Sequence, residues 1–383
     1  MIRNNKKPCK GTALPIGCCC KRSCEFVPCC LKSKVFYVNG KNDFPEDVPV
    51  ANRFSTVIAA IAANNAIDGG GNTVYVTDGA YEGSFVITQP VCLIGQSRGA
   101  VIYSTHDGGS PRGIWISSSD VTVENLTIVG FDSTGITEEE FDTCIYLAPI
   151  SPILFPGATP TPLKNVKIMN NDLQLGFNTN LAAGGDAGYG IVTQGFYDDS
   201  IWFTDILISN NRFIAQDETY GASRAVIINP GCANLLFTCN IIEGTYLKGP
   251  VFSGKNGDVV LMCNKFDGIS DYSLLLYYGG GVTDASGNPV DWGDATVIDN
   301  EFSNYIQWPL YVYYTPIKNK RIVGNIFTNL KPGAIGIHQY LGADSPITSA
   351  PIGTCLNNTP QLCSGAIYDV GDDLFVDYTA TAC

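Results

Sequence analysis

A short pattern of apolar and polar residues recurs between residues 166 and 327. The copies read apolar, any, apolar, any, any, Asn, any, apolar, as in VKIMNNDL (166–173) and ILISNNRF (206–213), except that the last copy has Lys320 in the first slot. Alternation with a period of two residues is typical of a β-strand that buries one face. The Asn that recurs at a constant offset is Asn171, Asn211, Asn240, Asn264, Asn300 and Asn325.

Shorter alternating segments lie between these copies, for example GIVT (190–193) and AVII (225–228). No helical period separates the two patterns, so the βαβ units of an α/β sheet do not fit. Consecutive Asn positions are 40, 29, 24, 36 and 25 residues apart. The pattern therefore predicts a chain that coils and stacks on itself, a parallel β-helix, with inserted loops in the longer intervals.

The recurring Asn has a physical reason in such a coil. A tight bend between two strands needs a residue near the left-handed region of backbone space, which Asn tolerates. Stacked Asn side chains can also hydrogen-bond to one another along the axis. We therefore expect the six Asn to form one line, with neighbours about one strand spacing (~4.8 Å) apart.

A helix is expected before the first strands, in FSTVIAAIAANNAI (54–67). Its apolar residues recur with helical spacing, which predicts one buried stripe. Strand-like NTVYVT, GSFVIT and VCLIG follow it. A helix in this place would cover the open sheet edge of the first coil. The residues of the stripe are Phe54, Val57, Ile58, Ile61 and Ala62.

Residues 57–96 read VIAAIAANNAIDGGGNTVYVTDGAYEGSFVITQPVCLIGQ. This phrase resembles the opening of right-handed parallel β-helix proteins of the pectin-lyase-like superfamily. The resemblance covers roughly 50–340 and implies an all-β fold, a right-handed parallel β-helix (solenoid) with an N-terminal capping helix. We expect a basic, cysteine-rich arm at 1–45, the β-helix at 46–340 and a C-terminal cap at 341–383.

Charge is spread unevenly along the 383 residues. Residues 1–42 hold nine Lys or Arg and one acid, a charge of +8, which leaves −21 for the rest of a chain whose net charge is −13. An acidic body argues against nucleic acid as the main partner. No apolar run approaches the ~20 residues that span a membrane, so no membrane partner is expected. The natural counter-surface of the basic arm is the body of a neighbouring copy.

The N-terminus does not read as a secretory signal, because positive charge continues through Lys21 and Arg22 without an apolar core segment. Fifteen cysteines are nevertheless an unusually large number for a protein that stays in a reducing cytosol. The two observations agree if the protein is made inside a cell and released by lysis. We therefore expect it on the exterior of a spore or virus particle, or otherwise outside the cell.

Many members of the resembled superfamily act on acidic polysaccharides, but their catalytic signatures are missing. Neither His106 nor His338 lies in a Gly-His-Gly motif. Asp198 and Asp199 are the best paired carboxylates, and a glycosidase needs two carboxylates that flank the bond. Arg224 is a weak basic candidate. An enzyme is therefore not favoured, and the sequence indicates no catalytic residue, resident metal or cofactor.

Three loops rich in Pro and Gly are candidates for function, at 148–165, 176–189 and 277–294. They could shape a binding surface or pack against neighbouring subunits. The aromatic segments LLLYYGGG and YIQWPLYVYYT have two readings: a surface on which sugars stack, or ladders of Tyr between adjacent strands. The second reading is favoured.

Seven cysteines crowd the arm without a histidine among them. Structural zinc favours two pairs of ligands, and only the spacing from Cys20 to Cys24 makes a good pair. A compact disulfide knot is a second alternative. Seven is odd, and adjacent cysteines rarely pair with each other, so cross-links between subunits are the leading hypothesis. The arm cysteines are Cys9, Cys18, Cys19, Cys20, Cys24, Cys29 and Cys30.

The favoured acceptors for such cross-links are Cys232, expected in a turn, and Cys383 at the end of the sequence. CLNNTPQLC (355–363) could close as a small disulfide loop. The arm also resembles, in style only, the cysteine-bearing N-terminal connectors of bacillus endospore appendage subunits, which have a jelly-roll body. The cysteines expected to be buried as small hydrophobic residues in strands are Cys92, Cys144, Cys239 and Cys263.

Two classes of function follow from the sequence. The first is a self-assembling structural subunit of an extracellular fibre or particle surface, cross-linked through the arm, whose main partner is another copy of itself. The second is a carbohydrate-active enzyme, a lyase or hydrolase, or a β-helix that binds glycans. Other surface proteins or glycans are further possible partners.

Overall fold

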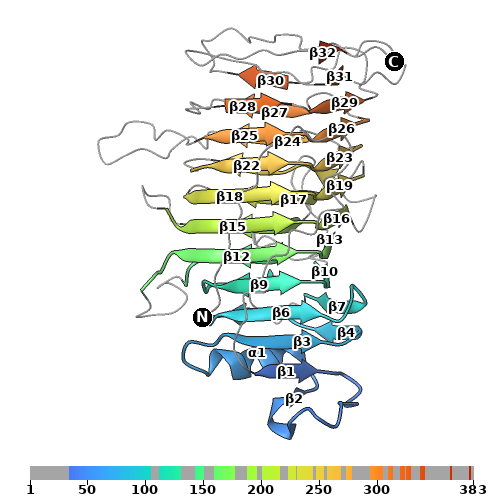
Figure 1. Ribbon diagram of the computed structural model, residues 1–383, viewed down its shortest axis with the longest axis vertical. Helices are drawn as coiled ribbons and strands as arrows, with labels where there is room; N and C mark the ends of the chain where they lie inside the picture. Colours follow the sequence, from blue (N-terminus) through green and yellow to red (C-terminus); the bar gives the residue numbers. More distant parts are fainter. Residues whose placement is uncertain are drawn as a thin grey trace, which may run out of the picture.

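In the computed structural model, the chain winds into one solenoid of stacked coils. The N-terminal coils lie at one end and the last coils at the other (Figure 1). Nearly all strand pairs of the described residues are parallel; the antiparallel pairs among them are β29–β31 and β31–β32. The predicted all-β, right-handed parallel β-helix is confirmed. The structure describes residues 34–104, 112–130, 143–150, 159–176, 188–195, 201–215, 223–229, 231–244, 247–253, 257–268, 273–277, 294–304, 309–313, 320–323, 325–328, 337–340, 363–364 and 379–380.

From β3 to β30, each coil contributes to each of three sheets, here named A, B and C. Sheet A contains β1 (Val35–Val38), β2 (Arg53–Phe54), β3 (Asn72–Val76), β6 (Val91–Gly95), β9 (Val121–Glu124), β12 (Leu163–Met169), β15 (Phe203–Ser209), β18 (Cys232–Thr238), β22 (Val259–Met262), β25 (Ala295–Ile298) and β28 (Lys320–Val323).

Sheet B follows sheet A in every coil. It contains β4 (Gly79–Glu82), β7 (Ala100–Tyr103), β10 (Thr127–Val129), β13 (Asp172–Leu175), β16 (Arg212–Ala215), β19 (Ile241–Glu243), β23 (Lys265–Asp267), β26 (Glu301–Ser303), β29 (Ile326–Thr328), β31 (Cys363–Ser364) and β32 (Thr379–Ala380).

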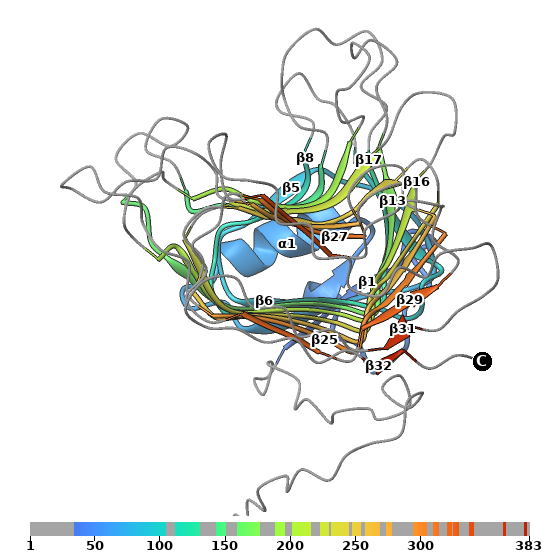
Figure 2. The ribbon, with the colours of Figure 1, turned by 90° about the horizontal axis from the view of Figure 1, so that it is seen from above.

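Sheet C completes each coil. It contains β5 (Phe85–Ile87), β8 (Arg112–Ile116), β11 (Thr143–Leu147), β14 (Tyr189–Thr193), β17 (Ser223–Ile228), β20 (Leu247–Lys248), β21 (Val251–Ser253), β24 (Leu274–Tyr277), β27 (Leu310–Tyr313) and β30 (Ile337–Tyr340). Seen along the axis, sheets A and C face each other and sheet B closes one side (Figure 2).

The interior is filled by side chains that stack in register from coil to coil. Alternate residues of each strand point inward, so the two-residue period of the sequence becomes a continuous apolar core. On sheet B, Phe266 and Phe302 lie opposite each other in register, and their rings stack at 4.8 Å between centroids with an interplanar angle of 8°. Such aromatic pairs add ~0.5–1.5 kcal/mol beyond their buried area.

The predicted Asn line is confirmed, and it is a hydrogen-bonded ladder in the buried corner between sheets A and B. The Oδ1 atom of Asn211 accepts hydrogen bonds from the backbone N–H and the Nδ2 of Asn171. The other Nδ2 hydrogen of Asn171 goes to the carbonyl of Val123. The same arrangement repeats from each Asn to the next, at 2.9–3.1 Å, through Asn240, Asn264, Asn300 and Asn325.

The reason given for the Asn was partly wrong, because the ladder residues do not adopt the left-handed backbone. That conformation belongs to the residue before each ladder Asn from Asn171 to Asn300, and to Asn125, which precedes Leu126 in the same slot of an earlier coil; φ lies between 52° and 61°. The preceding residue turns the chain at the surface, whereas the ladder Asn satisfies buried backbone groups. These left-handed corner residues are Asn125, Asn170, Asn210, Cys239, Cys263 and Asp299.

The capping helix α1 (Val57–Asn65) lies at the N-terminal end of the solenoid (Figure 1). Thr56 caps it, because its Oγ1 accepts a hydrogen bond from the backbone N–H of Ala59 at 3.2 Å. The predicted stripe is only partly right, because Ile58 and Ala62 are exposed. The buried face instead runs through Val57, Ala60, Ile61 and Asn64, since these face the first coil.

The solenoid begins earlier than expected. β1 starts at Val35, inside the stretch that the sequence assigned to the arm, and pairs in parallel with β2 and β3. A short 3-10 helix, η2 (Val50–Asn52), precedes β2. At the other end, β30 extends sheet C to Tyr340, and the short strands β31 and β32 extend sheet B.

Candidate functional site

The three loops singled out in the sequence all adjoin sheet C. Loops 148–165 and 277–294 lead from sheet C to sheet A, and loop 176–189 leads from sheet B into sheet C. Their central parts lie outside the described residues. The tight Asn corner joins sheets A and B, so the long insertions fall at the other two corners.

The outer face of sheet C carries a stripe of apolar side chains that runs along the axis. Trp115 and Tyr146 are in register on β8 and β11, with their rings edge to face at 5.9 Å. The indole Nε1 of Trp115 donates to the carbonyl of Ala148 at 2.9 Å. These side chains are buried. The stripe continues in register through Val192, Ile227, Val251, Leu275 and Tyr311.

The aromatic segments near the C-terminal end line up between strands. Tyr277 of β24 is in register with Tyr313 of β27, which is in register with Tyr340 of β30. The side chains of these three residues lie outside the described part.

The weak catalytic candidates do not assemble in the described residues. Arg224 is buried, and its Nη1 donates to the carbonyl of Gly249 at 3.2 Å, so it has a structural partner. His106, Asp198 and Asp199 lie outside the described residues. His338 lies on β30, in register with Tyr311.

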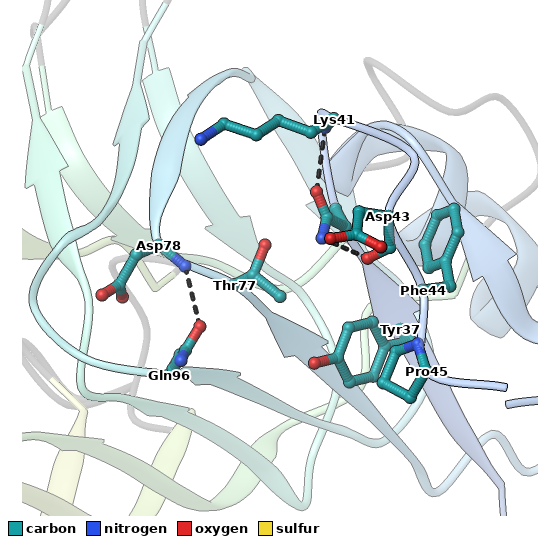
Figure 3. Close-up of a pocket in the computed structure, with 9 residues that line it drawn as sticks. Tyr37, Lys41, Asp43, Phe44, Pro45, Thr77, Asp78 and Gln96 are labelled. Atoms are coloured by element: carbon teal, nitrogen blue, oxygen red, sulfur yellow. Dashed lines mark hydrogen bonds between the residues drawn. The ribbon is translucent and has the colours of Figure 1, made fainter. Parts of the chain in front are cut away.

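A cavity of about 460 Å³ opens at the N-terminal end, beside the ends of β1, β3 and β6 (Figure 3). The segment after β1 forms one wall: the amide of Lys41 donates to the side-chain oxygen of Asn39 at 2.9 Å. On the other wall, the amide of Asp78 donates to Gln96 Oε1 at 3.2 Å. Tyr37, Asn39, Lys41, Asp43, Phe44, Pro45, Thr77, Asp78 and Gln96 line the cavity.

The cavity combines an aromatic wall with charged and amide groups. The ring of Tyr37 contacts Phe44 edge to face, with 6.2 Å between centroids. Burial raises the pKa of the Tyr37 hydroxyl, and nearby Tyr75, Asp47 and Asp43 raise it further. The phenol is therefore neutral at physiological pH and can donate or accept a hydrogen bond. Such a site suits a polyol or a basic side chain.

Cys232 is not an accessible acceptor for a cross-link, which corrects the sequence-based expectation. It lies at the start of β18, in register with Phe203, and its exposed fraction is 0%. Burial raises the pKa of its thiol well above the usual value. The segment NPGCAN, expected as a turn, instead contains the start of this strand, which begins at Cys232 itself. Cys144 is buried as expected.

Cys92 departs from the expectation in a different way. It is buried, but it is part of a disulfide rather than a small hydrophobic residue. The other cysteines whose side chains the structure describes (Cys144, Cys232, Cys239 and Cys263) are thiols. The partner of Cys92 therefore lies outside the described residues. The side chains of Cys9, Cys18, Cys19, Cys20, Cys24, Cys29, Cys30, Cys355, Cys363 and Cys383 also lie there.

Cys239 and Cys263 are the residues that sequence reasoning placed least well. Both were expected inside strands, yet both are half-buried corner residues with φ of 54° and 56°. The signal was present in the repeat, because each directly precedes a ladder Asn. The repeat allows any residue at the position before the Asn. The alternation of apolar residues does not reveal the backbone conformation of that position.

Within the described part of the chain, no group of three or more His, Cys, Asp or Glu side chains is arranged to hold a metal ion. None of the described helices is both long and apolar enough to cross a membrane. The zinc alternative concerns the arm cysteines, which lie outside these residues.

No protein-family profile matches the sequence, and no curated protein matches it. Solved structures do show similarity. PfbA, a surface adhesin of Streptococcus pneumoniae, aligns over 85% of this chain and 95% of its own, with 13% identity and a TM-score of 0.37. The Dettilon tailspike protein aligns over 82% and 67%, with 12% identity and a TM-score of 0.43. An alginate lyase from Paenibacillus sp. aligns over 75% and 95%, with 16% identity and a TM-score of 0.40.

Proposed function

We propose that this protein is a structural subunit that assembles outside the cell, in a fibre or on the surface of a spore or virus particle. Copies of the chain are joined by disulfides from the cysteine-rich N-terminal region. The β-helix acts as a rigid body, and the N-terminal region supplies the link to the next copy.

The disulfide at Cys92 is the observation that carries this proposal. Disulfides persist in oxidising surroundings and are rare in the cytosol. Cys92 is in register with Thr73, which is in register with Val35, so it lies two strands from the point where the N-terminal region enters the solenoid. A cysteine of the body next to this entry point is thus in a disulfide within the chain, which supports oxidising surroundings for the neighbouring N-terminal cysteines.

Charge and rigidity give further support. The N-terminal 42 residues carry +8 and the remainder −21, so the N-terminal region of one copy is attracted to the body of another. A contact between two different surfaces builds fibres unless it closes into a ring. The buried Asn ladder ties consecutive coils together from Asn171 to Asn325, which supports a rigid body.

The test compares the full chain with a variant that lacks residues 1–33 and with one whose seven N-terminal cysteines are all Ser. We expect the full chain to form assemblies that resist heat and denaturant until a reductant is added, and both variants to lose them. If both variants assemble as the full chain does, the N-terminal region is not the linker.

Cys92→Ser provides the matched control, because it removes the disulfide of the solenoid and keeps the N-terminal cysteines. Assemblies that persist in Cys92→Ser but disappear in the all-Ser variant would separate linking between copies from stabilisation of a single copy. Circular dichroism of each variant checks that the β-helix remains folded.

Glycan binding is the second candidate function, and the cavity beside Tyr37 and Phe44 favours it. Sugars offer hydroxyls to carboxylates and amides and an apolar face to aromatic rings, so Asp43, Asp78 and Gln96 would provide polar contacts. Calorimetry against acidic and neutral glycans tests this function, with Phe44→Ala as the variant that loses binding. Release of reducing ends or unsaturated uronate from the same glycans would indicate an enzyme.

A further inference from the structure

Cys239 and Cys263 occupy equivalent places on consecutive coils. Each follows the last residue of a sheet A strand, and these last residues, Thr238 and Met262, are in register. The backbone N–H of Cys239 donates to the carbonyl of Met262 at 3.1 Å, so the two corners are stacked directly. Both thiols are half-buried, in contrast to the fully buried Cys144 and Cys232.

The corner position is unfavourable for cysteine. A positive φ is uncommon for residues other than Gly, Asn and Asp, and other coils place Asn125, Asn170 and Asp299 in this corner. Cys239 and Cys263 therefore hold a strained backbone at two consecutive coils. Strain of this kind is typical of functional positions rather than of positions chosen for stability.

We propose that Cys239 and Cys263 form a two-thiol acceptor site for the adjacent cysteines in residues 1–33 of a second copy, an inference that rests on the proposed function. One strand spacing, ~4.8 Å, separates the two corners. Adjacent cysteines have Cα atoms ~3.8 Å apart, so Cys29–Cys30 or two of Cys18–Cys20 match the acceptor spacing. The hydroxyl of Thr238 donates to Cys239 Sγ at 3.5 Å, which stabilises negative charge on the attacking sulfur.

The chemistry is thiol oxidation by a small-molecule disulfide. A thiolate attacks the small disulfide and displaces one small thiol. The second protein thiolate then attacks this mixed disulfide, forms the protein disulfide and displaces the second small thiol. The two protons of the protein thiols end on the two released small thiols, so atoms and electrons balance for each cross-link.

Reach along the chain supports a second copy as the source of Cys29 and Cys30. Cys239 follows β18, six strand steps along sheet A from β1. These steps amount to at least ~29 Å at ~4.8 Å each. Cys30 is five residues before Val35, so it extends at most ~18 Å from β1. The chain's own Cys29 and Cys30 therefore cannot reach this site, whereas those of a neighbour can.

The experiment uses the full chain in unlabelled and isotopically heavy forms, which are mixed, reduced and then reoxidised with oxidised glutathione. Digestion without reductant and mass spectrometry identify the linked peptides. We expect links between residues 1–33 and Cys239 or Cys263 that combine light and heavy partners. The double variant Cys239→Asn/Cys263→Asn should lose most of its covalent polymer and remain folded, because Asn is the residue of three other corners.

Asp299→Asn is the matched control, because it changes the same corner of the next coil without removing a thiol. Undiminished polymer in the double variant would overturn the acceptor assignment but not the proposed function. Disulfides found only between two light peptides or two heavy peptides would also overturn it. So would a disulfide between Cys239 and Cys263. A full chain that forms no polymer dependent on residues 1–33 would overturn both proposals.

Discussion

The side-chain oxygen of Asn240 accepts two hydrogen bonds from Asn211, one from the backbone N–H at 3.0 Å and one from Nδ2 at 3.1 Å. Asn240→Ala would leave both buried donors without an acceptor. Each such group costs ~1–3 kcal/mol, so we expect a loss of about 2–4 kcal/mol in the free energy of unfolding. Urea denaturation followed by tryptophan fluorescence measures it.

Asn210→Gly is the matched control for this prediction. Asn210 is the exposed neighbour of the ladder and has a φ of 55°, which Gly adopts without strain. Its replacement should change stability by no more than ~0.5 kcal/mol. Equal effects of the two substitutions would contradict a special role for the buried ladder.

The ladder was predictable because its cause lies in the sequence itself. Asn171 and its equivalents recur at a fixed place relative to alternating apolar residues, and a solenoid turns this periodicity directly into stacking. The parallel β-helix followed from the two-residue period of the strands, and the capping helix from the helical spacing of apolar residues in 54–67. The exposure of Ile58 was missed because helical spacing alone does not show which side of the helix meets the first coil.

The surface chemistry was less predictable, since it depends on backbone conformation and on contacts between distant segments. Cys232 looked exposed in a turn-like segment, but pairing of β18 with β15 carries it into the core. Cys239 looked buried in a strand, but the chain turns outward there. The cavity beside Tyr37 joins residues from three coils, so no single stretch of sequence contains its signal.

Replacing a corner cysteine by Asn should stabilise the protein. Cys263 holds a φ of 56°, and relief of left-handed strain in a residue other than Gly contributes up to ~1 kcal/mol. We expect Cys263→Asn to raise the urea midpoint under reducing conditions. The reciprocal substitution Asn210→Cys should lower it by a similar amount, and shifts of the same sign in the two variants would contradict the strain argument.

Asp267 should contribute to stability in a pH-dependent way. Burial alone would raise its pKa, but hydrogen bonds from Asn304, Lys265 and Ser303 and the charge of Lys265 lower it overall. A carboxyl whose pKa is lowered in the folded state stabilises the fold above its unfolded pKa of ~3.9. That contribution is lost as the pH falls through the lower, folded-state pKa.

Asp267→Asn should therefore be less stable than the wild type near neutral pH, with the difference shrinking at acid pH. Urea midpoints measured from about pH 6 down to about pH 2 would show this convergence. Lys265→Met, which removes a cation 3.3 Å from the carboxylate, should shift stability in the same direction. Curves that stay parallel over the whole range would rule out a contribution from Asp267 ionisation.

The reactivity of the thiols should follow their burial. Iodoacetamide added to the folded, unassembled chain with its Cys92 disulfide intact should alkylate Cys239 and Cys263, which are half-buried at the surface. Cys144 and Cys232 have an exposed fraction of 0%, and burial raises the pKa of the Cys232 thiol, so both should react only after denaturation. Cys92 should require reduction as well, because it is in a disulfide. Mass spectrometry of the native and denatured samples distinguishes these three classes, and native labelling of Cys232 at the rate of Cys239 would contradict the placement of β18 in the core.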